Sequence, residues 1–139
     1  MIVDDFPDIR QSWSNDCGAA CLSAVMKFWG FSHAALLQLG DQHDAASAYD
    51  IVQYARAASL DAIGVALMAR SIDQEDLPAV LHWDGNHFVV LYETAEDRAL
   101  ILDPARGKAS YSWDVLEQRH TGAVILFGAA ARRALAEDT

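Results

Sequence analysis

Residues 11–22 read Gln11-Ser-Trp-Ser-Asn-Asp-Cys17-Gly-Ala-Ala-Cys21-Leu22, and this stretch opens the first helix that the sequence predicts. Asn15 or Asp16 is a suitable N-cap, and apolar residues recur at helical spacing directly after it. We expect the helix to cover about residues 16–29 and to end at Gly30. Cys17 then lies in the first turn of this helix.

The position of Cys17 favours a chemical role for its thiol. Free backbone amides at a helix N-terminus stabilise a thiolate, which is a good nucleophile. Gly18 leaves room for a substrate backbone to approach, and the side-chain amide of Gln11 could donate a hydrogen bond to a developing oxyanion. The same segment also fits a structural interpretation, in which Cys17 is a small buried apolar residue, as most free cysteines are.

Composition describes one compact, acidic domain. The chain has 139 residues, of which 53% are hydrophobic, and this is enough for a proper core. A net charge of −10 disfavours a nucleic-acid partner. No apolar run reaches the ~18 residues of a membrane helix, and the acidic N-terminus lacks signal-peptide features, so we expect a cytosolic location. Cys17 and Cys21, one helical turn apart, cannot form an unstrained disulfide and should be free thiols.

Helical patterns come first in the chain and strand patterns follow. Ser47 and Asp50 resemble a capping box, the apolar period changes from 3.6 to 2 after Leu60, and Asp84-Gly85 is a strong tight-turn signal. This order predicts an α+β fold with an antiparallel sheet. Further helices are expected at 32–39, 47–58 and 113–120, strands at 63–67, 79–83, 86–93, 98–103, 108–111 and 123–127, and a helix-prone tail with little to pack against at 129–139.

Two of these strands supply a test of the nucleophile hypothesis. If 86–93 and 98–103 form a hairpin centred near Ala95, His87 lies directly opposite Asp103. Opposed residues share a face with Cβ atoms ~4.5–5.5 Å apart, so the carboxylate could accept a hydrogen bond from one imidazole nitrogen. Such a contact fixes the tautomer of the ring and supports the imidazolium. Cys17, His87 and Asp103 would then be nucleophile, base and orienting acid.

Other interpretations of these residues remain open at this point. His87 could be an ordinary half-buried strand histidine, and Asp103 could begin the turn at Pro104. His82 competes for the role of base, but no acidic residue is obviously opposite it, so we expect it to be structural. A zinc site built on Cys17 and Cys21 is disfavoured, because structural zinc cysteines usually lie on loops and not inside an apolar helix.

These motifs resemble those of the bacterial double-glycine leader peptidases, which are bacteriocin-processing cysteine peptidases with a papain-like fold. Their glutamine-to-cysteine signature is similar to QSWSNDCGAACLSAV here, their histidine motif to LPAVLHWDGNHFVVLY, and their aspartate motif to ALILDPARGK. The closing TGAVILF is also similar. The resemblance covers about residues 8–128 and implies an N-terminal helical part packed on a C-terminal antiparallel sheet.

The resemblance also implies a role for each matching residue. Cys17 would be the nucleophile, His87 the general base and acid, and Asp103 the group that orients His87. Gln11 would complete the oxyanion hole with the backbone amide of Cys17. The expected activity is cleavage of a secreted peptide precursor after the Gly-Gly or Gly-Ala pair that ends its leader, without a cofactor.

The wider context of such a domain is a further expectation. Most members of the family are the cytosolic N-terminal domain of an ATP-driven export transporter, so an exporter is an expected partner. We expect one peptidase domain over 1–128, with 129–139 as a tail or the start of a linker, and either an excised domain or a free-standing peptidase. Two alternatives are a leader-binding module without activity and another thiol hydrolase or acyltransferase with the same residues.

Overall fold

The computed structural model describes residues 5–10, 17–31 and 47–137, which form helices on both faces of one six-stranded antiparallel sheet. Its strand order is β1-β6-β2-β3-β4-β5. The expected helix at 32–39 and the cap at Asn15 or Asp16 lie outside the described residues. The helices are α1 (Cys17–Phe28), α2 (Ala48–Ala57), α3 (Trp113–Arg119) and α4 (Gly128–Glu137); the strands are β1 (Ala62–Ala66), β2 (Ala79–Trp83), β3 (His87–Thr94), β4 (Arg98–Asp103), β5 (Gly107–Ser112) and β6 (His120–Phe127).

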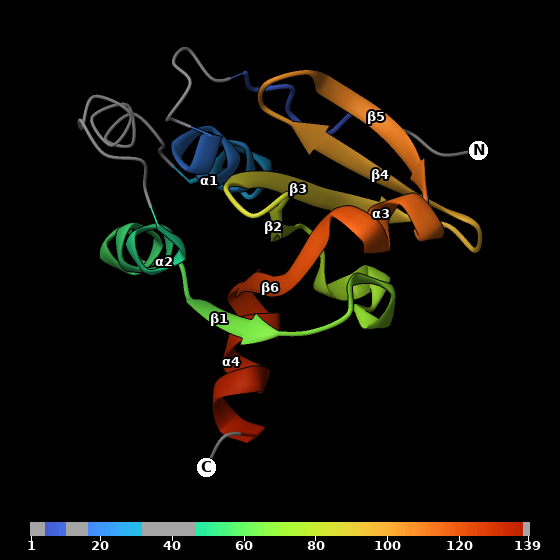
Figure 1. Ribbon diagram of the computed structural model, residues 1–139. Coiled ribbons are helices and arrows are strands. Elements are labelled where there is room, and N and C mark those ends of the chain that lie inside the picture. Colours follow the sequence, from blue (N-terminus) through green and yellow to red (C-terminus); the bar gives the residue numbers. More distant parts are fainter. Residues whose placement is uncertain (1–4, 11–16, 32–46, 138–139) are drawn as a thin grey trace.

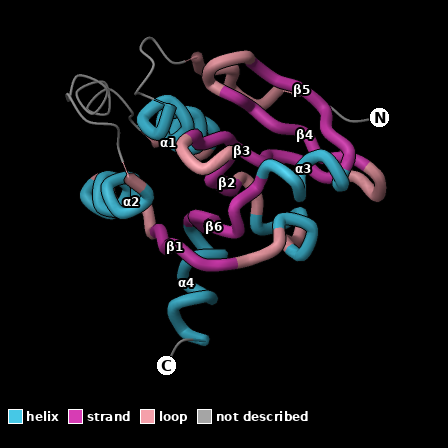
Figure 2. Tube along the Cα trace, viewed as in Figure 1, coloured by secondary structure: helices cyan, strands magenta, loops and turns pink. Residues whose placement is uncertain are grey.

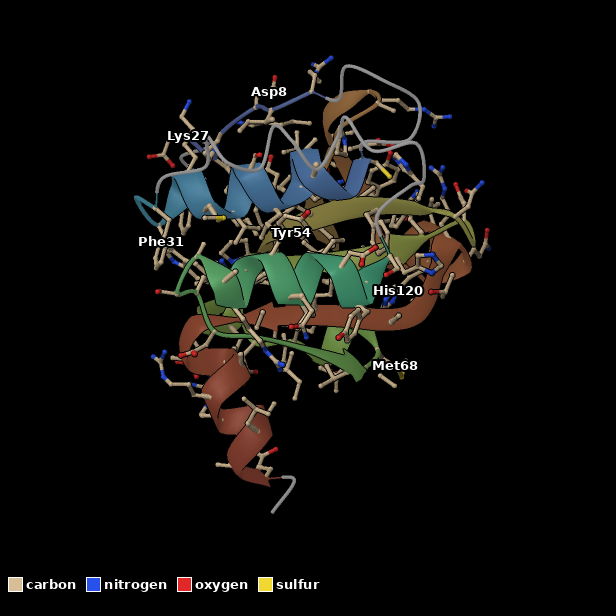
Figure 3. The ribbon with its side chains drawn as sticks, turned by 90° about the vertical axis from the view of Figure 1, so that its left-hand side faces the viewer. Asp8, Lys27, Phe31, Tyr54, Met68 and His120 are labelled. Atoms are coloured by element: carbon tan, nitrogen blue, oxygen red, sulfur yellow. The ribbon has the colours of Figure 1, made fainter. Side chains whose placement is uncertain are left out.

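The molecule has three layers, with helices on each face of the central sheet and an apolar core between each helical layer and the sheet. Helices α1 and α2 pack with one face of the sheet, and α3, α4 and the two 3-10 turns at Ala69–Ser71 and Gln74–Asp76 pack with the other (Figures 1 and 2). Figure 3 looks onto the first of these faces and shows α1 and α2 lying side by side over the sheet, roughly along its strands. The expected α+β fold with an antiparallel sheet is therefore confirmed.

The first helix is placed as the sequence predicts. All residues from Cys17 to Met26 are buried, because α1 lies between β3 and the N-terminal segment. Phe6 of that segment stacks on Tyr92 with ring centroids 4.7 Å apart. The chain leaves α1 through Gly30, whose φ of +77° lies in the left-handed region that glycine adopts without strain.

Capping residues and turns also follow the sequence. The Ser47 side chain accepts from the Asp50 amide while Asp50 accepts from the Ser47 amide, which is the expected capping box at the start of α2. Asp84 and Gly85 have φ values of +54° and +84° and are the central residues of a turn in which the Asn86 amide donates to the Trp83 carbonyl. The loop between β2 and β3 has three residues, because Trp83 pairs with His87.

The β3–β4 hairpin differs from the expected register by two residues. Leu102 pairs with Val90, so continuing the ladder sets Asp103 opposite Val89 and not opposite His87. The hairpin turns later than predicted, as the Ala95 amide donates to the Arg98 carbonyl, and the ladder is interrupted by a bulge after Leu91. The prediction of direct opposition is wrong because of the later turn, which shifts the pairing next to it by three residues, so that Thr94 pairs with Ala99. The bulge reduces this shift to two residues. A displacement of two residues nevertheless keeps both side chains on the same side of their strands.

The C-terminal residues pack more closely than expected. They form α4, in which Ala130 and Ala131 are buried against β1 and β6. Ion pairs of Arg132 with Asp61 and of Arg133 with Asp76 fasten the helix to the domain. The expectation that this segment has little to pack against is wrong, because its small alanines fit against the sheet. Within the described ranges, no helix is both long and apolar enough to cross a membrane.

Candidate active site

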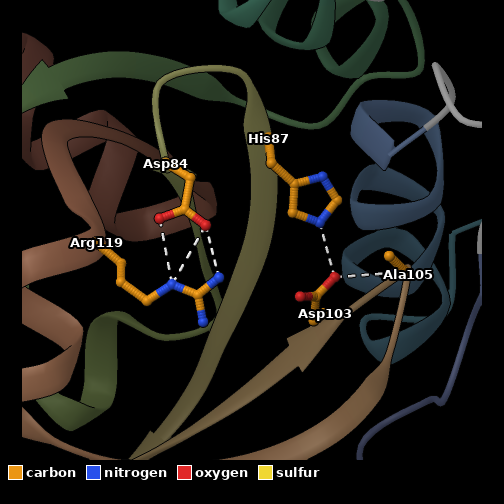
Figure 4. Close-up of polar contacts among 5 residues, drawn as sticks. All are labelled: Asp84, His87, Asp103, Ala105 and Arg119. Atoms are coloured by element: carbon orange, nitrogen blue, oxygen red, sulfur yellow. Dashed lines mark hydrogen bonds and ion pairs between the residues drawn. The ribbon is translucent and has the colours of Figure 1, made fainter.

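His87, the first residue of β3, and Asp103, the last residue of β4, form a partly buried hydrogen bond. His87 Nε2 lies 2.7 Å from Asp103 Oδ1, and the side chain of Asp103 is only 4% exposed (Figure 4). The backbone amide of Ala105 donates to the same oxygen at 2.9 Å. The predicted contact is therefore present as a diagonal pair, within the reach of long side chains on neighbouring strands.

Electrostatics favour the charged form of this pair. The hydrogen bond with Asp103, and after it one with Cys17, raises the pKa of His87 from 6.5 to about 9. Burial alone would raise the pKa of Asp103, but hydrogen bonds from His87 and the Ala105 amide hold it below its ordinary value. At neutral pH the site therefore contains an imidazolium and a carboxylate.

Cys17 completes this group from the neighbouring helix. It is the first residue of α1 and is 5% exposed, and its interaction with the His87 side chain helps to raise the pKa of that imidazole. Because Nε2 of His87 is occupied by Asp103, Nδ1 is the ring nitrogen left for the thiol. The three predicted residues thus meet at one place, although they come from α1, β3 and β4.

Cys21 does not share this environment. It lies one turn further along α1 and has no exposed surface. Burial, followed by the neighbouring Cys17 and Asp103 charges, raises the pKa of the Cys21 thiol well above its ordinary value. Both cysteines are free, and Cys21 should remain a neutral thiol.

The other predicted candidates stand as follows. Gln11 lies outside the described residues, so its place in an oxyanion hole stays a prediction. His82 Nδ1 lies 2.9 Å from the hydroxyl of Thr121, and its ring contacts Phe88, which fits the structural role we expected. No group of three His, Cys, Asp or Glu side chains suited to a metal ion is present in the described part of the chain.

Sequence reasoning missed one polar pair close to His87. Arg119, the last residue of α3, forms an ion pair with Asp84 at the β2–β3 turn, with Nη2 and Oδ2 2.5 Å apart. Figure 4 shows this pair and the His87–Asp103 pair on either side of β3. The two residues are 35 positions apart, and no local pattern in the sequence indicates that they meet.

Comparisons with known proteins point to one family. Residues 5–132 match the sequence profile of the Peptidase C39 family. The colicin V secretion/processing ATP-binding protein CvaB of Escherichia coli is 30% identical over 131 residues, which are 86% of this chain and 18% of that protein. An uncharacterized protein of Methanothermobacter thermautotrophicus is 26% identical over 121 residues, with 85% of each chain covered.

Solved structures show the same fold. A double glycine motif protease from an AMS/PCAT transporter, solved in complex with the leader peptide, has a TM-score of 0.78 and 29% identity, covering 87% of this chain and 89% of that chain. The peptidase domain of Streptococcus ComA, a bi-functional ABC transporter, also has a TM-score of 0.78 at 24% identity, covering 88% and 98% of the two chains. The papain-like fold that we expected is confirmed by these structures.

Proposed function

The chain belongs to the peptidase C39 family, which consists of cysteine peptidases, and from this premise we propose that it cleaves a bacteriocin-like precursor after the Gly-Gly or Gly-Ala pair ending its leader. The observation that carries the proposal is the partly buried hydrogen bond between His87 and Asp103 beside the thiol of Cys17. This arrangement of thiol, imidazole and carboxylate is the one that nucleophilic acyl transfer requires.

The first half of the reaction forms an acyl-enzyme. The Cys17 thiolate attacks the carbonyl carbon of the last leader residue, the second of the Gly-Gly or Gly-Ala pair, and the resulting oxyanion accepts hydrogen bonds from the Cys17 amide and Gln11. Removing one such donor costs ~3–4 kcal/mol in comparable sites. The His87 imidazolium then gives its proton to the leaving amine as the carbon–nitrogen bond breaks, and the leader remains attached as a thioester.

The second half releases the leader. Neutral His87 takes a proton from a water molecule, whose oxygen attacks the thioester carbon. The carbon–sulfur bond breaks, which frees the leader carboxylate and returns Cys17 to the thiolate form. Asp103 remains ionised throughout and holds the imidazole through Nε2, so that Nδ1 faces the thiol. Specificity for glycine would come from a channel too narrow for a Cβ atom.

An apolar groove beside the site suits the leader. It has a volume of about 380 Å³ and reaches Phe88, the residue after His87. Exposed Tyr49 and Met68 lie close to its lining residues in the chain. A solved relative was captured with a leader peptide, and an amphipathic leader helix could place its apolar face in such a groove. The groove is lined by Ala48, Gly64, Val65, Ala66, Val80, His82, Phe88, Thr121, Gly122, Ala123, Val124 and Ile125.

We also propose two possible arrangements for this peptidase, one as part of an ABC exporter and one as a free-standing protein. The chain spans 18% of the length of CvaB, which supports an association with the membrane and nucleotide-binding parts of an ABC exporter. Such an association would place the domain at the cytosolic face of the membrane. A relative of similar length in Methanothermobacter thermautotrophicus supports the alternative of a free-standing cytosolic peptidase. Under either arrangement we propose that residues 1–128 are the peptidase domain.

Synthetic precursors test the proposed activity directly. The purified chain is incubated with peptides whose leaders end in Gly-Gly, Gly-Ala or Ala-Ala, and the products are identified by mass spectrometry. We expect cleavage after the first two pairs only, and none by the Cys17→Ala variant. Binding without cleavage would instead indicate a leader-binding module, and transfer to an added amine would indicate an acyltransferase.

A further inference from the structure

The turn that precedes His87 is held to α3 by several contacts between Asp84 and Arg119. Arg119 donates through Nε to both carboxylate oxygens of Asp84 at 3.2 Å and through Nη2 to Oδ2 at 2.5 Å. In return, the backbone amide of Asp84 donates to the Arg119 carbonyl at 2.8 Å. A turn residue with positive φ is thus fixed by a forked ion pair and a backbone hydrogen bond.

The same arginine is connected to the residue that faces His87 in the sheet. The guanidinium carbon of Arg119 lies 4.8 Å from the centre of the Trp83 ring, which is fully buried. Trp83 is the direct partner of His87 in the β2–β3 ladder. Arg119 therefore contacts both the turn that leads into His87 and the side chain opposite it.

The exposure of the ion pair suggests that its role is positional. The side chains of Arg119 and Asp84 are 24% and 43% exposed, and exposed pairs usually contribute little to stability. We propose that Asp84 and Arg119 are positioning residues for His87, which hold the β2–β3 turn so that the imidazole stays in reach of both Asp103 and Cys17. Neither residue touches the reacting atoms in this proposal.

The charges near His87 allow positioning to be separated from simple electrostatics. Asp103 on β4, Cys17 on α1 and Asp84 at the turn interact with His87, while Arg106 and Arg119 interact with these carboxylates. Hydrogen bonding to Arg119 lowers the pKa of Asp84, with a smaller contribution from the His87 charge. If only charge mattered, neutralising Asp84 would lower the pKa of His87, and neutralising Arg119 would raise it.

The experiment follows the His87 imidazole by NMR titration in Asp84→Asn and Arg119→Gln. Asparagine before glycine suits this type of turn, so Asp84→Asn removes the ion pair while keeping the turn residues favourable. Positioning predicts that both variants lower the pKa of His87 from about 9 toward its ordinary value, because both loosen its contact with Asp103. Shifts in opposite directions, or no shift, would overturn the proposal.

Asp61→Asn is the matched control. It removes the exposed ion pair that Asp61 makes at 2.6 Å with Arg132, a residue of α4. This pair lies away from His87. We expect all three variants to melt at similar temperatures, and only Asp61→Asn to keep the His87 titration of the parent chain. Melting temperatures lowered only in the Asp84 and Arg119 variants, with an unchanged titration, would show a structural role and also overturn the proposal.

Cleavage of a Gly-Gly leader peptide gives a second readout, which depends on the proposed function. We expect kcat to fall roughly tenfold in the Asp84 and Arg119 variants with KM unchanged, within the ~100-fold that a 1 Å misplacement can cost. If even the parent chain cleaves no peptide, the proposed function fails, whereas the NMR titration still decides the positioning role.

Discussion

The first and second turns of α1 each carry a cysteine, and the two thiols meet different surroundings. Cys17 lies at the helix end, keeps 5% of its surface exposed and contacts His87. Cys21 is fully buried, and burial raises its pKa well above the ordinary value. Under the proposed function, one helical turn separates the nucleophile from an inert thiol, because only the first turn combines the helix N-terminus with a neighbouring imidazole.

Removal of each thiol in turn gives the largest expected contrast. Cys17→Ala should abolish leader-peptide cleavage, by a factor of at least ~1,000, because the nucleophile is lost. Cys21→Ala should keep activity within about a factor of two. Peptide cleavage is followed by mass spectrometry, and circular dichroism checks that both variants fold. Equal losses of activity in both folded variants would contradict the assignment of Cys17 as the nucleophile.

A smaller effect is expected from Asp103→Asn. One oxygen of Asp103, Oδ1, accepts from both His87 and the Ala105 amide, so an asparagine oxygen could accept both bonds and keep the ring oriented. The charge that stabilises the imidazolium would be lost. We expect the pKa of His87 to fall below about 9 and kcat to fall about 10- to 100-fold.

The Asp103→Asn variant also separates two roles of Asp103, which are orienting the His87 ring and stabilising the charge of the imidazolium beside Cys17. If Asp103→Asn reduces kcat as strongly as Cys17→Ala does, the carboxylate has a larger role than orienting the ring. If kcat is unchanged while NMR shows a lowered His87 pKa, the imidazolium is not needed for the rate-limiting step.

Much of the site could be predicted from the sequence because its determinants are local. The helix start at Cys17, the turn at Asp84-Gly85 and the cap at Ser47 each depend on a few adjacent residues. The face of a strand on which a side chain lies depends only on even or odd spacing. The later turn alone would shift the pairing by three residues, and the bulge after Leu91 makes the shift an even two, which keeps His87 and Asp103 on the same face. Their contact was therefore predicted correctly from a wrong register.

Features fixed by distant contacts could not be predicted in this way. The bulge after Leu91 and the later turn of the β3–β4 hairpin depend on how the sheet packs with α1 and α3. The pair of Arg119 with Asp84 joins residues far apart in the chain. The packing of Ala130 and Ala131 depends on the path of β1 and β6, because alanine alone does not indicate a partner.

The charge on His87 should also make stability depend on pH. The pKa of His87 is raised above its unfolded value of 6.5, so its stabilising contribution is complete below pH 6.5 and is lost as pH rises through about 9. The loss should be on the order of 3 kcal/mol. Urea denaturation between pH 6 and 10 measures it. His87→Gln should remove this dependence, whereas His82→Gln, which alters a histidine bonded to Thr121, should keep it.

The smallest effect is expected at Cys21, where the contrast with Cys17 can be measured on one unmodified chain. Iodoacetamide at pH 7.5 should modify Cys17 in the native protein and reach Cys21 only after denaturation, because Cys21 has no exposed surface and its thiol is kept neutral by burial. Peptide mapping by mass spectrometry identifies the modified residue. Cys21→Ala should lower the free energy of unfolding by only about 1 kcal/mol, since a single buried sulfur is removed and neighbouring side chains can partly close the space. Modification of both cysteines at similar rates in the native state would show that the second turn of α1 opens to solvent, and the distinction between the two thiols would then be one of rate and not of structure.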